Sequence, residues 1–118
     1  MITGIGLDLV ELKRIEQLHK SYTQFADRIL SPAERELFQT KNHIDNQVAF
    51  LSGRYAAKEA FSKAYGTGIG ESVSFQDIVI LNDKNGKPYI ARSPHLGSTF
   101  ITITHANDMA AAQIILEK

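Results

Sequence analysis

The residues from 53 to 70 constrain the fold of this chain more than any other stretch. Together with residues 46–52, the first half of the stretch is rich in helix-forming residues and contains no proline, so it predicts a helix of about five turns. One stripe of this helix has only small side chains and would let another backbone approach closely; it consists of Ala49, Gly53, Ala57, Ala60 and Ala64. The second half cannot continue the helix, because Gly66 is a natural left-handed cap. The rest of the chain must therefore pack around one long central helix.

The turn after this helix is a candidate anion site. It reads Gly66-Thr67-Gly68-Ile69-Gly70, and glycines of this kind can leave backbone N–H groups free to face a bound anion. The run is not a dinucleotide-binding motif, because that motif follows a strand and opens a helix. A flexible connection from helix to strand accounts for the same glycines equally well.

Length and composition narrow the class of protein. The chain has 118 residues, enough for a single domain covering residues 1–118. Its 13 basic and 13 acidic residues give a formal net charge of zero, which argues against a general nucleic-acid binder. The lack of cysteine excludes a disulfide framework and a thiolate metal site. We find no signal peptide and no apolar run of about 18 residues, so we expect a cytoplasmic protein with no membrane association.

The N-terminal ten residues predict a strand with one unusual acid. Ile5, Leu7 and Leu9 alternate with Gly4, Gly6 and Asp8, so the two sets face opposite sides. A carboxylate in so apolar a strand is costly to bury unless it is paired, hydrogen-bonded or bound to a metal. Asp8 is therefore either a cap for a helix that begins near Glu11 or a functional carboxylate, as a metal ligand or a general base.

The remaining periodicity predicts helices first and an antiparallel sheet last. We expect helices at residues 11–20, 22–30 and 32–40, and strands at residues 78–81, 88–91, 99–105 and 110–116. Ser31 and Glu34 form a capping box for the third helix, and Asp45 is expected to cap the central helix. The sequence Asp-Lys-Asn-Gly within residues 82–87 predicts a hairpin turn. This order of a strand, several helices and an antiparallel group predicts an α+β fold.

Asp8 and Glu59 are the only acids set among small or apolar residues in two strongly patterned elements. Without cysteine or a clear pair of histidines, two carboxylates suit a hard cation such as Mg²⁺, which also takes water and phosphate oxygens. Lys63, Lys58 and Arg54 could then neutralise phosphate charge. The alternative is that Glu59 and Lys63, four residues apart, form only a solvated ion pair on the helix surface.

Two further features admit a functional or a structural explanation. His105 ends an alternating strand, where it could be a general base or a ligand-binding group, or simply a structural residue. The helix at residues 11–20 has a mainly basic outer face that includes Lys13 and Arg14. Such a face is either solvated or docks an acidic partner.

Several motifs together resemble one enzyme family. Residues 4–8 resemble the opening of the small phosphopantetheinyl transferases of the holo-[acyl-carrier-protein] synthase type, and residues 50–64 resemble that family's second signature. Residues 66–70 continue the second signature, and residues 75–78, 85–88 and 103–105 also match in order. The resemblance covers the whole chain without a detectable insertion.

The resemblance implies transfer of the 4′-phosphopantetheine arm of coenzyme A to a serine of an acyl carrier protein, leaving adenosine 3′,5′-bisphosphate. It implies that Asp8 and Glu59 bind Mg²⁺ and that Lys63 meets the diphosphate. The coenzyme A site would be lined by Arg54, Lys63, Gly66, Gly68, Pro88 and His105. Lys13, Arg14 and Arg28 would face the acidic carrier, although the neutral Ser21 and Gln24 leave that surface less basic than we expect. The base for the serine proton is left open between a metal-oriented water, Glu59 and His105.

The C-terminal strands predict a homo-oligomer, and we expect this oligomer to be a trimer. Residues 100–103 and 110–116 carry apolar or small side chains on both faces, and the helices of one short chain can cover only one of them. Closed packing of three sheets would bury the other face and leave coenzyme A clefts between subunits. Two other classes compete with the transferase: a nucleotide-binding regulatory module without turnover, and a purely structural α+β oligomer.

Overall fold

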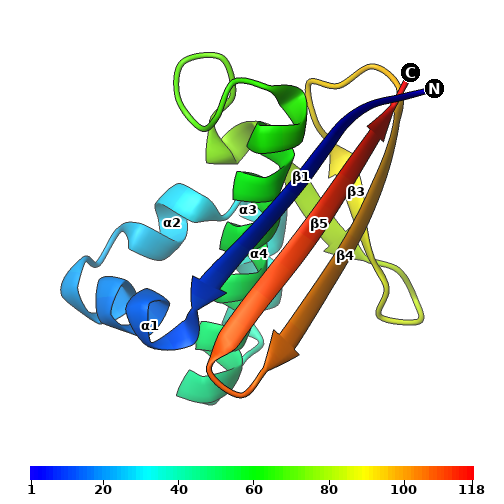
Figure 1. Ribbon diagram of the computed structural model, residues 1–118. Coiled ribbons are helices and arrows are strands. Elements are labelled where there is room, and N and C mark those ends of the chain that lie inside the picture. Colours follow the sequence, from blue (N-terminus) through cyan, green and yellow to red (C-terminus); the bar gives the residue numbers. More distant parts are fainter.

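A long helix packed across one face of a small antiparallel sheet forms the centre of the molecule. The computed structural model describes residues 1–118. The helix is α4 (Ile44–Tyr65), and the sheet has the order β1-β5-β4 with antiparallel pairing throughout. Its strands are β1 (Ile2–Glu11), β4 (Ser98–Ala106) and β5 (Met109–Glu117). Figure 1 shows the two chain ends together at one end of this sheet. The predicted α+β class is confirmed.

The smaller elements lie on the α4 side of the sheet (Figure 1). They are α1 (Leu12–Ser21), α2 (Phe25–Ile29), α3 (Pro32–Gln39), the 3₁₀ helix η1 (Phe75–Asp77), and the hairpin of β2 (Val79–Asn82) and β3 (Pro88–Arg92). The capping box of Ser31 and Glu34 is present at the start of α3. The hairpin turn is also present, and Gly86 takes the positive φ of 86° that the turn requires. The sequence did not predict η1.

The small-residue stripe of α4 is where the strands approach the helix. A Cβ atom on Gly4 would overlap the carbonyl oxygen of Ala64, and one on Gly6 would overlap that of Ala60. A Cβ on Gly53 would lie 3.2 Å from the Ile103 side chain. The glycines of β1 are therefore required by close contact between backbones rather than by a turn.

The cap of α4 differs from the prediction. His43 occupies the N-cap position, and its Nδ1 accepts a hydrogen bond of 3.3 Å from the backbone N–H of Asp45. Asp45 is not the cap because it already lies inside the first turn, where its negative charge interacts favourably with the helix dipole. None of the helices combines the length and the hydropathy that a membrane span needs.

The outer face of the three-stranded sheet is apolar and uncovered. Ile5, Leu7 and Leu9 are 59%, 61% and 63% exposed, and Phe100 on β4 is 52% exposed. The inner face contributes the alternating buried side chains of β5 to the core, including Ile114 and Leu116. In β1 it is therefore Gly4, Gly6, Asp8 and Val10 that lie on the inner side, while Ile5, Leu7 and Leu9 face away from the chain's own helices.

Candidate active site

The close approach of β1 to α4 brings Asp8 against the C-terminal half of the long helix. The Lys63 Nζ donates hydrogen bonds to Asp8 Oδ1 at 3.0 Å and to the Leu7 carbonyl oxygen at 3.1 Å. Lys63 makes no ion pair with Glu59, so the interpretation as a surface pair within the helix is wrong. Asp8 does not cap α1 either, because the N-cap residue is Glu11 and no side-chain cap bond is present.

Glu59 has a half-buried carboxylate that accepts no hydrogen bond and forms no ion pair within the chain. Burial raises the pKa of this carboxyl, the negative charge of Asp8 raises it further, and Lys63 and Arg14 act in the opposite direction. Two neighbouring carboxylates, one of them unpartnered, repel each other unless a cation is shared between them.

The donor set fits a magnesium ion. Asp8 and Glu59 supply hard carboxylate oxygens, which is the ligand class that Mg²⁺ prefers. No cluster of three or more histidine, cysteine, aspartate or glutamate side chains is present that could enclose a metal. A cation held by these two carboxylates would therefore keep positions for water and for substrate oxygens.

Arg14 and Tyr55 complete the surroundings of the carboxylates. Arg14 projects from α1 and is close enough to lower the pKa of Glu59. Tyr55 lies one helical turn before Glu59; its pKa is raised by burial and then by the charge of Glu59. Its ring lies between those of Phe25 and Phe75, with centroid distances of 6.2 and 5.6 Å. The sequence did not single out Tyr55, although its spacing of four residues from Glu59 was a usable signal.

A second site lies around Arg54, on another side of α4. An open pocket of about 640 Å³ is lined by residues that include Lys41, Phe50, Arg54, Asn82 and His105. The Arg54 Nη2 donates to the Ile80 carbonyl oxygen at 3.0 Å and to Asn82 Oδ1 at 2.7 Å, and its guanidinium lies 4.3 Å from the Phe50 ring centroid. Burial lowers the pKa of Arg54, opposed by the charge of Glu34. The structure thus brings Arg54 and His105 together.

His105 and Glu59 of one chain lie far apart. The His105 Nε2 is 2.9 Å from the carbonyl oxygen of Ala49, which precedes Glu59 by ten residues on α4. Ten residues correspond to about 15 Å along a helix axis. Pro88 does not line the Arg54 pocket; it pairs with Asn82, which does. The predicted site residues therefore form two groups on one chain rather than one.

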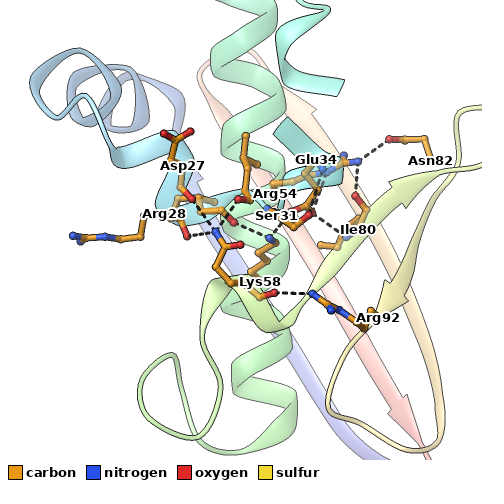
Figure 2. A network of polar contacts seen from close by, with 12 residues as sticks. Asp27, Arg28, Ser31, Glu34, Arg54, Lys58, Ile80, Asn82 and Arg92 are labelled. Carbon is orange, nitrogen blue, oxygen red and sulfur yellow. Dashed lines mark hydrogen bonds and ion pairs between the residues drawn. The ribbon is translucent and has the colours of Figure 1, made fainter. Parts of the chain in front are cut away.

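Lys58 was expected to neutralise phosphate charge, and this expectation is wrong. Its side chain is fully buried, and its Nζ donates to Glu34 Oε1 at 2.6 Å and to the Ile29 carbonyl oxygen at 2.7 Å. The other carboxylate oxygen of Glu34 accepts from the backbone N–H of Ile80 at 2.9 Å. Figure 2 shows Lys58, Glu34 and Arg54 converging in one network under the β2–β3 hairpin. Lys58 is committed to the core and cannot reach a ligand.

The N–H groups of the glycine-rich turn are not free. The N–H groups of Gly66 and Gly68 both donate to the carbonyl oxygen of Ser62, at 3.0 and 3.2 Å, and that of Gly70 donates to Val73 at 2.8 Å. The expectation of an open anion nest is therefore wrong, because the helix end itself uses the donors. The assignment of Gly66 and Gly68 to coenzyme A binding stays a prediction based on resemblance.

The predicted basic residues are exposed on α1 and α2. Lys13, Arg14 and Arg28 are exposed, and we refer to these three residues as the basic surface. Beside Arg28 is an open pocket of about 500 Å³ with an apolar floor that includes Leu18 and Phe25. Because Arg14 also acts on Glu59, the basic surface reaches the carboxylate site.

Comparisons with known proteins agree over nearly the whole chain. A family model described as the 4′-phosphopantetheinyl transferase superfamily matches residues 4–114. The chain is 53% identical over 117 residues to a holo-[acyl-carrier-protein] synthase of Enterococcus faecalis, covering 99% of this chain and 98% of that protein. It is 48% identical over 119 residues to the Bacillus subtilis protein of the same name, covering 100% and 98%.

Solved structures give the same result. A holo-(acyl-carrier-protein) synthase from Bacillus anthracis, in complex with CoA (3′,5′-ADP), matches with a TM-score of 0.90 and 43% identity, covering 98% of this chain and 96% of that one. A holo-[acyl-carrier-protein] synthase from Helicobacter pylori, in complex with coenzyme A, matches with a TM-score of 0.83 and 32% identity, covering 96% and 99%.

Proposed function

The chain belongs to the 4′-phosphopantetheinyl transferase superfamily and is an enzyme of the holo-[acyl-carrier-protein] synthase family, and from this premise we propose how its site works. It moves phosphopantetheine from coenzyme A to an acyl carrier protein. The finer proposal is that the transfer depends on Mg²⁺ and releases adenosine 3′,5′-bisphosphate. The observation that carries it is the unpartnered carboxylate of Glu59 beside Asp8 and Lys63.

In this proposal Asp8 and Glu59 hold the magnesium ion, which offsets the negative charge of the diphosphate when bound. Lys63 is 53% exposed, so its ammonium can turn from Asp8 toward a phosphate oxygen. A serine hydroxyl of the carrier attacks the β-phosphorus of coenzyme A, and the bond from that phosphorus to the bridging oxygen breaks. The negative charge that develops on the leaving bisphosphate faces Lys63.

The proton of the attacking serine goes to Glu59 or to a water molecule that Glu59 holds. The Glu59 carboxylate accepts no hydrogen bond and forms no ion pair within the chain, so one of its oxygens is available for the proton or for that water molecule. His105 of the same chain is about 15 Å away along α4, so it belongs with Arg54 in binding the nucleotide end of coenzyme A.

We also propose that the enzyme is a homotrimer whose sites combine two chains. The exposed Ile5, Leu7 and Leu9 form an apolar sheet face that a symmetric neighbour would cover. The separation of His105 from Glu59 within one chain supports a site to which one subunit contributes the carboxylates and the next contributes the Arg54 pocket. Sedimentation should then give about three times the 13.1 kDa of the chain, and a fully active monomer contradicts the shared site.

The acidic carrier is proposed to dock on the basic surface of Lys13, Arg14 and Arg28, next to the carboxylates. The protein is expected to work in the cytoplasm, which fractionation of cells can test. The transfer itself is tested by incubating the protein with coenzyme A, Mg²⁺ and apo-carrier. The carrier should gain the mass of one phosphopantetheine group; a regulatory module or a structural oligomer would leave its mass unchanged.

A further inference from the structure

We propose that Gln76 and Lys58 are positioning residues that fix α2, the short helix carrying Arg28, relative to the turn of α4 that carries Glu59. The inference rests on the proposed function in one respect, because it takes Arg28 to be part of the surface that the carrier meets. It concerns two residues that touch neither substrate.

Helix α2 cannot be stable by itself. It has five residues, whereas isolated helices shorter than about 12 residues are marginal in water. The last four carbonyl groups of any helix have no partner inside the helix. In a helix of five residues these unpartnered groups are most of the backbone, so the position of α2 depends on what satisfies them.

Side chains from two other elements satisfy four consecutive carbonyl oxygens at this end. The Gln76 Nε2 on η1 is 2.8 Å from the Asp27 oxygen, 3.2 Å from that of Arg28 and 2.8 Å from that of Leu30. The Lys58 Nζ on α4 donates to the remaining oxygen, that of Ile29, at 2.7 Å. The amide nitrogen has only two hydrogens, so at least one of its three contacts is shared.

The geometry holds the Arg28 backbone and leaves its side chain free. Figure 2 shows the carbonyl of Arg28 facing the network while its guanidinium extends away from it. The Lys58 ammonium also places a positive charge at the C-terminal end of α2, which the helix dipole favours. Gln76 itself is tied down, because the Arg92 Nη2 donates to its carbonyl oxygen at 3.3 Å.

The N-terminal end of α2 also packs against α4. The ring of Phe25 packs on Tyr55 of α4, which in turn stacks on Phe75 beside Gln76. Helix α2 is therefore fixed at both ends to α4 and η1, and its contacts with α4, at Tyr55 and Lys58, lie in the turn that leads into Glu59. Arg28 thereby keeps a fixed distance from the carboxylate at which the carrier serine must arrive.

The test replaces Gln76 by methionine, which has nearly the same length and no N–H donors. Gln76→Met should raise the Michaelis constant for the carrier roughly tenfold, with kcat and the Michaelis constant for coenzyme A changed less than about twofold. Hydrogen exchange should become faster at the amides of Arg28 and Leu30, which donate within the end of α2. The control Gln39→Met, at the exposed end of α3, should change none of these quantities.

A merely structural role for Gln76 gives a different result. It would lower the amount of folded enzyme and leave both Michaelis constants unchanged, or change both equally, and either outcome overturns the inference. If Gln76→Met does not fold, Gln76→Asn keeps one amide with a shorter reach; it should raise the carrier constant about threefold without affecting coenzyme A. Equal effects on both substrates in that variant also overturn the inference.

A parallel variant separates the failure of this inference from the failure of the proposed docking surface. Arg28→Ala removes the side chain and leaves the clamped backbone in place. If Arg28→Ala raises the carrier constant and Gln76→Met does not, the positioning role is wrong and the docking surface stands. If Arg28→Ala has no effect on the carrier constant, the docking role of Arg28 is wrong, and the inference falls with it.

Discussion

Lys58 and Glu59 are neighbours on α4, yet they belong to two charged clusters with opposite properties. Lys58 and Glu34 are both 0% exposed and form an ion pair. The Glu34 carboxylate also accepts hydrogen bonds from the backbone N–H groups of Ser31 and Ile80, and the Lys58 ammonium donates one to the carbonyl oxygen of Ile29. Glu59 is partly buried and has no partner for its carboxylate. The first cluster is closed and the second is open.

The contrast indicates that the closed cluster stabilises the fold and that the open cluster serves the reaction. A closed cluster contributes to the fold because every charge in it already has its partners. In the open cluster, burial and the charge of Asp8 both disfavour the charged form of the Glu59 carboxylate. A cation that binds there relieves this unfavourable interaction, so the cluster is a candidate binding site. The same kinds of residue, one position apart, therefore have different tasks because of what surrounds them.

Removing one member of the closed cluster should give the largest effect on stability. Lys58→Met leaves the buried carboxylate of Glu34 without its counter-ion, so we expect a loss of about 3–5 kcal/mol in the free energy of unfolding. Denaturant unfolding followed by circular dichroism measures it. Restoring most of the stability in the double variant Lys58→Met/Glu34→Gln would confirm that the unpaired charge is the cause; a single variant as stable as the natural chain contradicts the closed-cluster interpretation.

Removing a member of the open cluster should affect turnover and not the fold. Asp8→Ala is expected to lower kcat by about a hundredfold or more, about 2.7 kcal/mol in activation free energy, because it removes half of the proposed cation site. The unfolding midpoint should stay close to that of the natural chain. Unchanged activity with magnesium as the only divalent cation would falsify the metal assignment.

The basic surface should give an intermediate effect confined to one substrate. Arg14→Glu is expected to raise the Michaelis constant for the carrier roughly tenfold and to weaken its salt dependence, since it reverses a charge on the proposed docking surface for an acidic partner. The Michaelis constant for coenzyme A should stay nearly the same. A drop in coenzyme A affinity instead means that α1 belongs to the nucleotide site.

The smallest predicted effect is a gain of stability in the open cluster. The pKa of Glu59 is raised in the folded chain, so the folded state prefers the protonated form, and this preference costs stability as the pH rises through the folded-state pKa. Glu59→Gln removes the cost and should raise Tm by about 1–3 °C at neutral pH in the absence of Mg²⁺. The gain should vanish at acid pH, where the natural carboxyl is protonated; a gain that is independent of pH has another cause.

Local sequence patterns predicted the parts of this picture that depend on local structure. The strand with Asp8, the long helix with Glu59 and the capping box of Ser31 are each recognisable within a few residues, and all three are present. The small-residue stripe predicted a close backbone approach, and Gly4 and Gly6 of β1 meet it at Ala64 and Ala60.

What the sequence missed depends on tertiary partners. Lys58 resembles a ligand-binding lysine until Glu34, which lies 24 positions earlier in the chain, is brought against it. The N–H groups of the glycine-rich turn are taken by Ser62, and the role of Gln76 depends on carbonyl groups 46 to 49 positions away. Side-chain partners at such separations leave no periodic trace in the sequence.

The most direct test of the contrast between the two clusters is the transfer reaction with Glu59→Gln. This variant keeps the shape of the side chain and the closed cluster beside it and removes only the unpartnered charge. With coenzyme A, Mg²⁺ and apo-carrier, the intact mass of the carrier should show complete modification by the natural enzyme and almost none by Glu59→Gln, although the variant is folded. A folded Glu59→Gln enzyme that modifies the carrier at the natural rate would contradict the account.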